Sequence, residues 1–177
     1  MVRYLFVLLV VMAFAAPAFA QDVPQLELGF GYGNYSMKDL FPNRANGFTT
    51  RQTINLNSIF AIENYLGFYW FGTQACCGKT ELISEHIGGR VSYRNLGPVL
   101  YGNASIGGGF FRFPQAGVGD SSFGVKYGGG VDIPFKEFFA WNIDVSRMAY
   151  GHPSVLAGDG RVGGLNISAG IVIKMGE

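Results

Sequence analysis

Charged residues are scarce in this chain of 177 residues, at 14% against roughly 25% in ordinary soluble domains. The 13 basic and 12 acidic side chains nearly cancel, so the charge balance gives no reason to expect a nucleic-acid partner. A disordered chain is excluded as well, because 49% of the residues are apolar and can be buried.

Long apolar runs are absent after residue 20, so no helix in that part of the sequence can cross a bilayer. The N-terminal segment is the exception. Arg3 precedes an apolar run over 4–16, and the segment ends in Ala18-Phe19-Ala20. This layout predicts a secretory signal peptide over residues 1–20 and an exported domain over 21–177. An uncleaved membrane anchor is the alternative, although the run is short for one.

Cysteine is also scarce, and the only two, Cys76 and Cys77, are adjacent. An exported protein meets oxidising conditions, but neighbouring cysteines bridge each other only through a strained ring. A vicinal disulfide or thiol pair that shapes the loop, an intermolecular bridge and a metal site all stay open. No C-x-x-C motif or nearby histidine supports a metal, and the glycine runs lack the G-K-[ST] signature of a phosphate loop. We therefore expect no cofactor.

Alternation with period two is what the sequence does contain. In the first exported stretch Leu26, Leu28, Phe30 and Tyr32 alternate with small or polar residues, as in a strand with two different faces. Stretch 66–73 is apolar on both parities, so its facing is uncertain. Further strands are predicted over 51–63, 83–93, 100–110, 122–133, 139–146 and 164–173.

The eight stretches predict an all-β fold: an eight-stranded antiparallel up-and-down transmembrane β-barrel. One parity is branched or aromatic, which suits a lipid-facing exterior, whereas the other is mostly Gly, Ser and Asn, which suits a narrow interior. A water-soluble barrel with its apolar parity inward is the alternative. We expect aromatic girdles from outward residues near the strand ends: Tyr32, Phe60, Tyr93, Phe110, Phe123 and Trp141.

The connections alternate in length, which orients the barrel. Short turns are predicted at 64–65, 95–98 and 134–137, and longer loops at 36–50, 74–82, 112–121 and 151–161. Outer-membrane barrels have short periplasmic turns and long external loops. Both chain ends are therefore expected on the periplasmic side.

Three stretches, the first of them rich in glycine, resemble a known family. They are Tyr127-Gly128-Gly129-Gly130-Val131-Asp132, then 139–144 (FAWNID), then 166–173 (NISAGIVI). These patches are similar to the small outer-membrane β-barrel domains related to OmpA and OmpX, especially the acidobacterial versions. The resemblance implies location in a bacterial outer membrane. The chain departs from that family by ending in Lys174-Met175-Gly176-Glu177 instead of a terminal aromatic residue.

The polar parity carries a set of charges that we expect to point into the lumen: Glu27, Arg51, Glu63, His86, Arg90, Lys126, Asp132 and Asp144. Buried charges need partners. A three-residue turn at 134–136 predicts Lys126 directly opposite Asp144 as an ion pair, with Arg90 as a further partner at similar depth. The set either forms a polar ion path or plugs the lumen, and the narrow interior of eight strands favours a plug.

The sequence therefore predicts a non-enzymatic envelope protein with a structural or surface role. Its expected partners are outer-membrane lipid, lipopolysaccharide and the barrel-assembly machinery, with no nucleic acid. One alternative is an adhesion module acting through external loops, with Phe41, Phe48, Phe113 and Arg112 as anchors. The other is a hydrolase similar to the lipid A deacylases. It would use His152 and Ser154, with Asn166 in the place where that family usually has an acidic residue.

Overall fold

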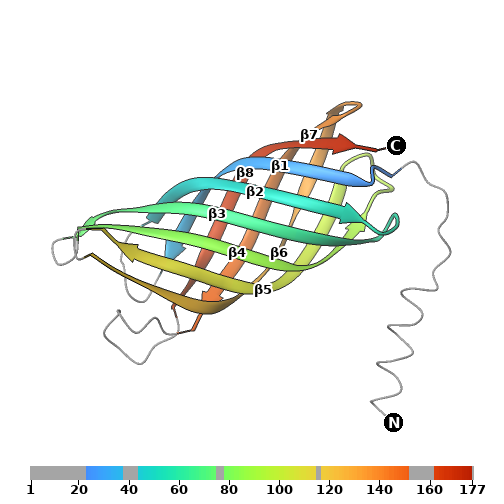
Figure 1. Cartoon of the computed structure of the whole chain (residues 1–177). Helices are drawn as coiled ribbons and strands as arrows, with labels where there is room; N and C mark the ends of the chain where they lie inside the picture. Colours follow the sequence, from blue (N-terminus) through green and yellow to red (C-terminus); the bar gives the residue numbers. More distant parts are fainter. Residues whose placement is uncertain (1–22, 38–43, 75–77, 115–116, 152–161, 177) are drawn as a thin grey trace, which may run out of the picture.

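The computed structural model describes residues 23–37, 44–74, 78–114, 117–151 and 162–176. They form a closed antiparallel barrel in which every strand pairs with its neighbour in sequence and β8 returns to β1 (Figure 1). The strands are β1 (Leu26–Met37), β2 (Arg44–Asn55), β3 (Phe60–Gln74), β4 (Gly78–Tyr93), β5 (Val99–Phe113), β6 (Val118–Lys136), β7 (Phe139–Tyr150) and β8 (Val162–Met175). Closure pairs the backbone groups that a lipid environment could not satisfy.

The described residues include no helix long and apolar enough to cross a membrane. In this barrel the apolar parity faces outward. Phe30, Ile54, Ile143 and Ile167 are all exposed, whereas Glu27, Arg51 and Asp144 are buried. The alternative of a water-soluble barrel with an apolar interior is therefore wrong.

The predicted aromatic positions lie on the outer surface. Tyr32, Tyr93, Phe110, Phe123 and Trp141 are exposed, and Phe60 is half-buried. At the end of the barrel with the long connections, here called the loop end, Tyr32, Phe48 and Trp70 pack edge to face. At the opposite turn end, Trp141 stacks on Phe135. An outer apolar belt thus lies between two aromatic rims, as in barrels that cross hydrocarbon.

Two details of the strand prediction are wrong. The first short turn does not lie at 64–65, because β3 runs through these residues and the turn occupies 56–59. There Asn57 Oδ1 accepts hydrogen bonds from the backbone N–H groups of Ile59 and Phe60, at 2.8 and 2.7 Å. The strands also run further toward the loop end than predicted, so three of the long connections are shorter than expected.

Candidate functional site

The barrel interior is the candidate site, and all eight charged or titratable residues predicted for it are buried there, each no more than 7% exposed. Seven of the eight form a network near the turn end of the barrel: Glu27, Arg51, Glu63, Arg90, Lys126, Asp132 and Asp144. They alternate along their strands with outward apolar residues. The period-two pattern is therefore what brings these groups together.

Asp132 on β6 is the acidic group with the shortest contacts to basic side chains in this network. Arg90 Nη2 donates to Asp132 Oδ2 at 2.5 Å, and Arg51 Nη2 lies 3.1 Å from Asp132 Oδ1. Asn142 Nδ2 donates to the same carboxylate at 2.7 Å. Both oxygens are thus occupied by charge-assisted or amide donors, the arrangement that buried carboxylates require.

Tyr101 joins the two arginines to the other acids. The Arg90 guanidinium carbon lies 3.9 Å from the centre of the Tyr101 ring, and that of Arg51 lies 4.9 Å away. Arg51 Nη1 donates to the Tyr101 hydroxyl at 2.7 Å, which in turn donates to Asp144 Oδ2 at 3.1 Å. Cation–π contacts of this kind strengthen when water is excluded.

Lys126 and Asp144 form the predicted ion pair, but not through the predicted register. Lys126 Nζ lies 3.9 Å from Asp144 Oδ1 and 3.7 Å from Glu63 Oε1. In the sheet, however, Lys126 is opposite Met148 and Asp144 is opposite Gly130. The three-residue turn is wrong because β6 continues to Lys136, with a register shift after Pro134, and Lys136 pairs with Phe139. The long lysine side chain spans the resulting offset.

Arg90 is a partner of other acids than expected. Its guanidinium lies 3.5 Å from Glu27 and 3.8 Å from Glu63, in addition to its contact with Asp132. No ion pair between Arg90 and Asp144 occurs among the described residues.

Arg94, which the sequence prediction missed, completes the charge balance. It follows the end of β4, and its Nη2 lies 3.1 Å from Glu27 Oε1 and donates to Asn55 Oδ1 at 3.0 Å. Its Nε donates to the Ser58 carbonyl at 3.2 Å. With Arg94 the network holds four bases against four acids. The signal was available, since Arg94 is the next inward position after Arg90 and Ser92.

His86 lies outside the ion-pair network. Its Nδ1 lies 3.2 Å from Ser84 Oγ, and its ring is 5.8 Å from the ring of Tyr150. The Tyr150 hydroxyl donates to the same Ser84 oxygen at 2.9 Å. His86 therefore belongs to a second, aromatic layer closer to the loop end.

This second layer contains four inward tyrosines, Tyr35, Tyr65, Tyr69 and Tyr150, all nearly inaccessible to solvent. Tyr65 and Tyr69 share a hydrogen bond between their hydroxyls, and Tyr69 donates to Asn166 Oδ1 at 2.8 Å. Around and beyond them, toward the loop end, lie the other members of a buried apolar cluster: Met37, Ala45, Phe71, Leu82, Phe111, Phe113, Met148 and Val162. The interior is thus ionic toward the turn end and aromatic toward the loop end.

The structure bears on two predicted sites, the hydrolase site and the cysteine pair. Asn166 is buried inside the barrel, and its Oδ1 accepts a hydrogen bond from the Tyr69 hydroxyl. Cys76, Cys77, His152 and Ser154 lie outside the described residues. No group of three metal-binding side chains occurs in the described part of the chain.

The predicted adhesion anchors are also affected. Phe113 is buried in the apolar cluster, and Phe48 lies in the outer aromatic rim at the loop end, beside Tyr32 and Trp70. Arg112 is exposed, with its Nη1 3.7 Å from Glu81 Oε2. Phe41 lies outside the described residues.

Comparisons with known proteins agree with this architecture. No protein with a curated description matches the chain in sequence. Among solved structures, neisserial surface protein A superposes with a TM-score of 0.64 at 13% identity, covering 88% of this chain and 100% of that one. OprG of Pseudomonas aeruginosa gives 0.58 at 9% identity, covering 88% and 97%.

Ail, the attachment invasion locus protein of Yersinia pestis, in complex with the heparin analogue sucrose octasulfate, gives a TM-score of 0.57 at 19% identity, covering 85% and 99%. At these identities the likeness shows the fold alone. The family match shows more than the fold, because the model of the outer membrane protein beta-barrel domain matches residues 6–172, which is most of the chain. The chain belongs to the outer membrane protein β-barrel domain family, whose proteins lie in the bacterial outer membrane.

Proposed function

We propose that the protein is a non-enzymatic structural barrel of the outer membrane whose interior is plugged and whose role is exercised at its surface. The observation that carries the proposal is the balance of the interior: four bases and four acids pair near the turn end, and an aromatic layer lies toward the loop end. A space beside Arg51, Lys126 and Asp144 measures only about 20 Å³. That volume is close to the minimum that a single water molecule needs.

Conductance in planar lipid bilayers tests the plug. Refolded full-length protein should give no large, stable single-channel openings, because an ion would have to displace paired charges and then pass the tyrosines. A larger pore-forming barrel, added afterwards to the same bilayer, controls for detection. Stable openings by this protein itself, with its folding verified by heat-modifiable gel mobility, would contradict the proposal.

The proposed partners are outer-membrane lipid and lipopolysaccharide around the apolar belt, and the barrel-assembly machinery during insertion. Support for the lipid contact comes from the outward Phe, Ile and Val side chains between the aromatic rims. Delivery to that membrane is proposed to depend on residues 1–20 as a cleaved leader. The mature N-terminus, read by sequencing of protein from the outer-membrane fraction, should then lie near Gln21.

Adhesion through the external loops is the second candidate, supported by the fold shared with the attachment protein Ail. Exchange of the connection between β1 and β2, and of that between β5 and β6, for those of an unrelated barrel separates the two. Unchanged binding of cells to surfaces after the exchange supports the structural role, and lost binding supports adhesion. A lipid A hydrolase is disfavoured by the inward position of Asn166, and unchanged lipid A acylation in a Ser154→Ala strain would eliminate it.

A further inference from the structure

Glu85 is an acidic side chain on the lipid-facing surface of the barrel. It is exposed on β4, and its outward neighbours along that strand are Ile83 and Ile87. None of the ion pairs formed by the described residues includes it. A charge on the lipid face of a barrel is costly unless it finds a partner.

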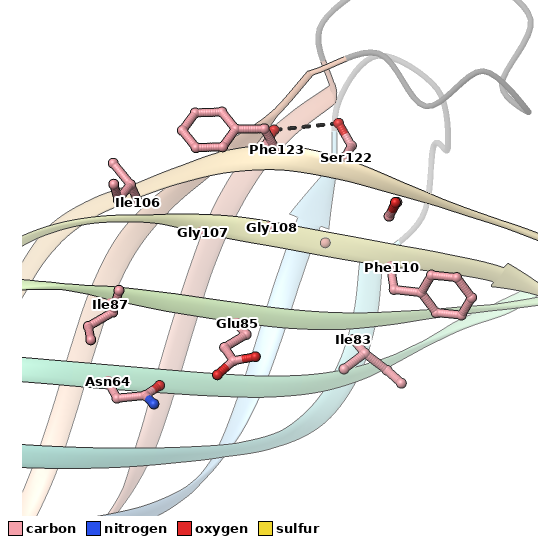
Figure 2. A pocket seen from close by; sticks show the side chains of 12 residues that line it. Asn64, Ile83, Glu85, Ile87, Ile106, Gly107, Gly108, Phe110, Ser122 and Phe123 are labelled. Carbon is pink, nitrogen blue, oxygen red and sulfur yellow. Dashed lines mark hydrogen bonds between the residues drawn. The ribbon is translucent and has the colours of Figure 1, made fainter.

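Glu85 lies in a hollow of the outer surface that can receive such a partner. The hollow measures about 600 Å³ and is lined on β5 and β6 by Ile106, Phe110 and Phe123. Figure 2 shows Glu85 and Asn64 projecting from neighbouring strands beside Ile87 and Ile83. A carboxylate next to a primary amide, in an apolar frame, offers several acceptors to a planar guanidinium, which donates through more than one N–H.

Two arginines border a second hollow across the barrel. Arg44 on β2 and Arg147 on β7 are both exposed and line a space of about 480 Å³ together with Asn34 and Ser36. In the sheet Arg44 is opposite Ser36, Ser36 is opposite Leu165, and Leu165 is opposite Arg147. No carboxylate of the described residues pairs with either arginine. The two positive charges at this hollow therefore repel each other without a negative charge to offset them.

The direction of the strand tilt follows from the rows of paired residues. From Glu85 the row descends through Leu66, Thr50, Phe30 and Ile171 to Trp141 at the turn end. In the other direction it rises through Gly108 to Phe123, whose carbonyl binds the N–H of Gly151 at the loop end. At the usual tilt of about 40°, each strand-to-strand step changes the level by ~3 Å and each residue along a strand by ~2.5 Å.

Glu85 and Arg147 consequently lie at the same level of the membrane. Their rows cross β1 at Phe30 and Ser36, and this separation along the strand places the second row ~15 Å higher. Glu85 lies three strand steps, or ~9 Å, above Phe30, and Arg147 lies two strand steps, or ~6 Å, below Ser36. These two height differences add up to ~15 Å and cancel the separation of the two rows on β1. Two barrels standing upright in one bilayer therefore present these charges to each other at matching depth.

We infer that the chain associates with copies of itself inside the membrane, with Arg147 of one copy entering the Glu85 hollow of the next. The contact converts two lipid-facing charges into one charge-assisted pair, with Asn64 as an additional acceptor. Because the two faces differ, the contact is heterologous and generates rows or rings of barrels. In this contact Arg147 of the first copy faces Glu85 of the second copy.

Cross-linking in vesicles of phosphatidylcholine alone tests this contact without anionic lipid. Reporter cysteines are placed beside the charges and on their loop-end side, at Ile83→Cys in one preparation and Leu165→Cys in another, both in full-length chains carrying Cys76→Ser and Cys77→Ser. Mixing the two should give disulfide-linked dimers, whereas either preparation alone should give at least tenfold less. Glu85→Gln in the Ile83→Cys chain should reduce the dimer yield at least tenfold.

A charge exchange and a matched position make the result decisive. Glu85→Arg should abolish the dimer with wild-type Arg147, and mixing it with an Arg147→Glu chain should restore the dimer. Ile171→Cys, on the outer surface of β8, replaces Leu165→Cys as the control and should give only the background yield. Monomers alone, a yield insensitive to Glu85→Gln, or equal yields with Ile171→Cys would each overturn the inference.

Discussion

Asp132 connects two arginines that would otherwise lie in the barrel interior with too few partners. Asp132→Asn should lower the free energy of unfolding by about 3–5 kcal/mol, because it leaves Arg51 and Arg90 as buried cations with their nearest carboxylate removed. Urea unfolding in detergent micelles, followed by tryptophan fluorescence, measures the change.

The exposed ion pair between Arg112 and Glu81 is the matched control. Arg112→Gln should change the free energy of unfolding by less than about 1 kcal/mol, since water and salt screen pairs at the surface. Equal decreases in the free energy of unfolding for both variants would show that the interior ion pairs stabilise the barrel no more than an exposed pair does.

At the residue scale, sequence reasoning predicted which charges turn inward but not which charges meet. Inward position follows from parity alone, so Glu27, Arg51 and Asp144 could be placed correctly. The actual partners depend on strand register and on side-chain reach around the barrel. Arg90 therefore pairs with Asp132 across the lumen, which spacing along one strand cannot reveal.

At the element scale, inward glycines on neighbouring strands make room for tyrosine rings. A Cβ on Gly124 would lie 2.5 Å from Tyr150 Cδ1 and 2.8 Å from its Cε1. The ring cannot move freely, because Phe111 packs against it edge to face and Ser84 accepts its hydrogen bond. Gly124→Ala should therefore destabilise the barrel by about 1–3 kcal/mol.

Gly89 is the matched glycine for this experiment, since a Cβ there meets nothing within 4 Å. Gly89→Ala should leave the fraction of folded protein on a heat-modifiable gel, and its urea midpoint, unchanged. If Gly124→Ala behaved like Gly89→Ala, the tyrosine layer would be looser than its contacts indicate.

Strand number was predictable from the sequence, whereas strand ends were not. Ile54 before the first turn and Leu56 at its start have the same parity as Phe60 and Ile62 after it, so the alternation continues in phase across 56–59 and hides the turn. At the loop end the inward parity changes from small to aromatic, as at Tyr150. Because of this change, the sequence pattern did not predict the last residues of several strands or the tyrosine layer that they form.

At the scale of the whole molecule, the two layers of the interior divide the barrel along its axis. Ion pairs join strands across the lumen near the turn end, and tyrosine hydrogen bonds join them toward the loop end. Since both sets bridge strands distant in sequence, they depend on closure of the barrel. A sequence that predicts a closed barrel therefore also predicts that its inward side chains form a network. The individual contacts within that network do not follow from the sequence.

The orientation of the barrel is the remaining global property, and single cysteines test it. Val118 at the loop end and Leu96 in the turn between β4 and β5 are both exposed. In chains carrying Cys76→Ser and Cys77→Ser, Val118→Cys should react with a membrane-impermeant maleimide on intact cells. The two longest connections, between β1 and β2 and between β7 and β8, lie at its end of the barrel, and long connections of outer-membrane barrels face outward. Leu96→Cys should react only after the outer membrane is permeabilised. Labelling of Leu96→Cys on intact cells, with Val118→Cys protected, would place the short turns and both chain ends outside the cell and reverse the barrel.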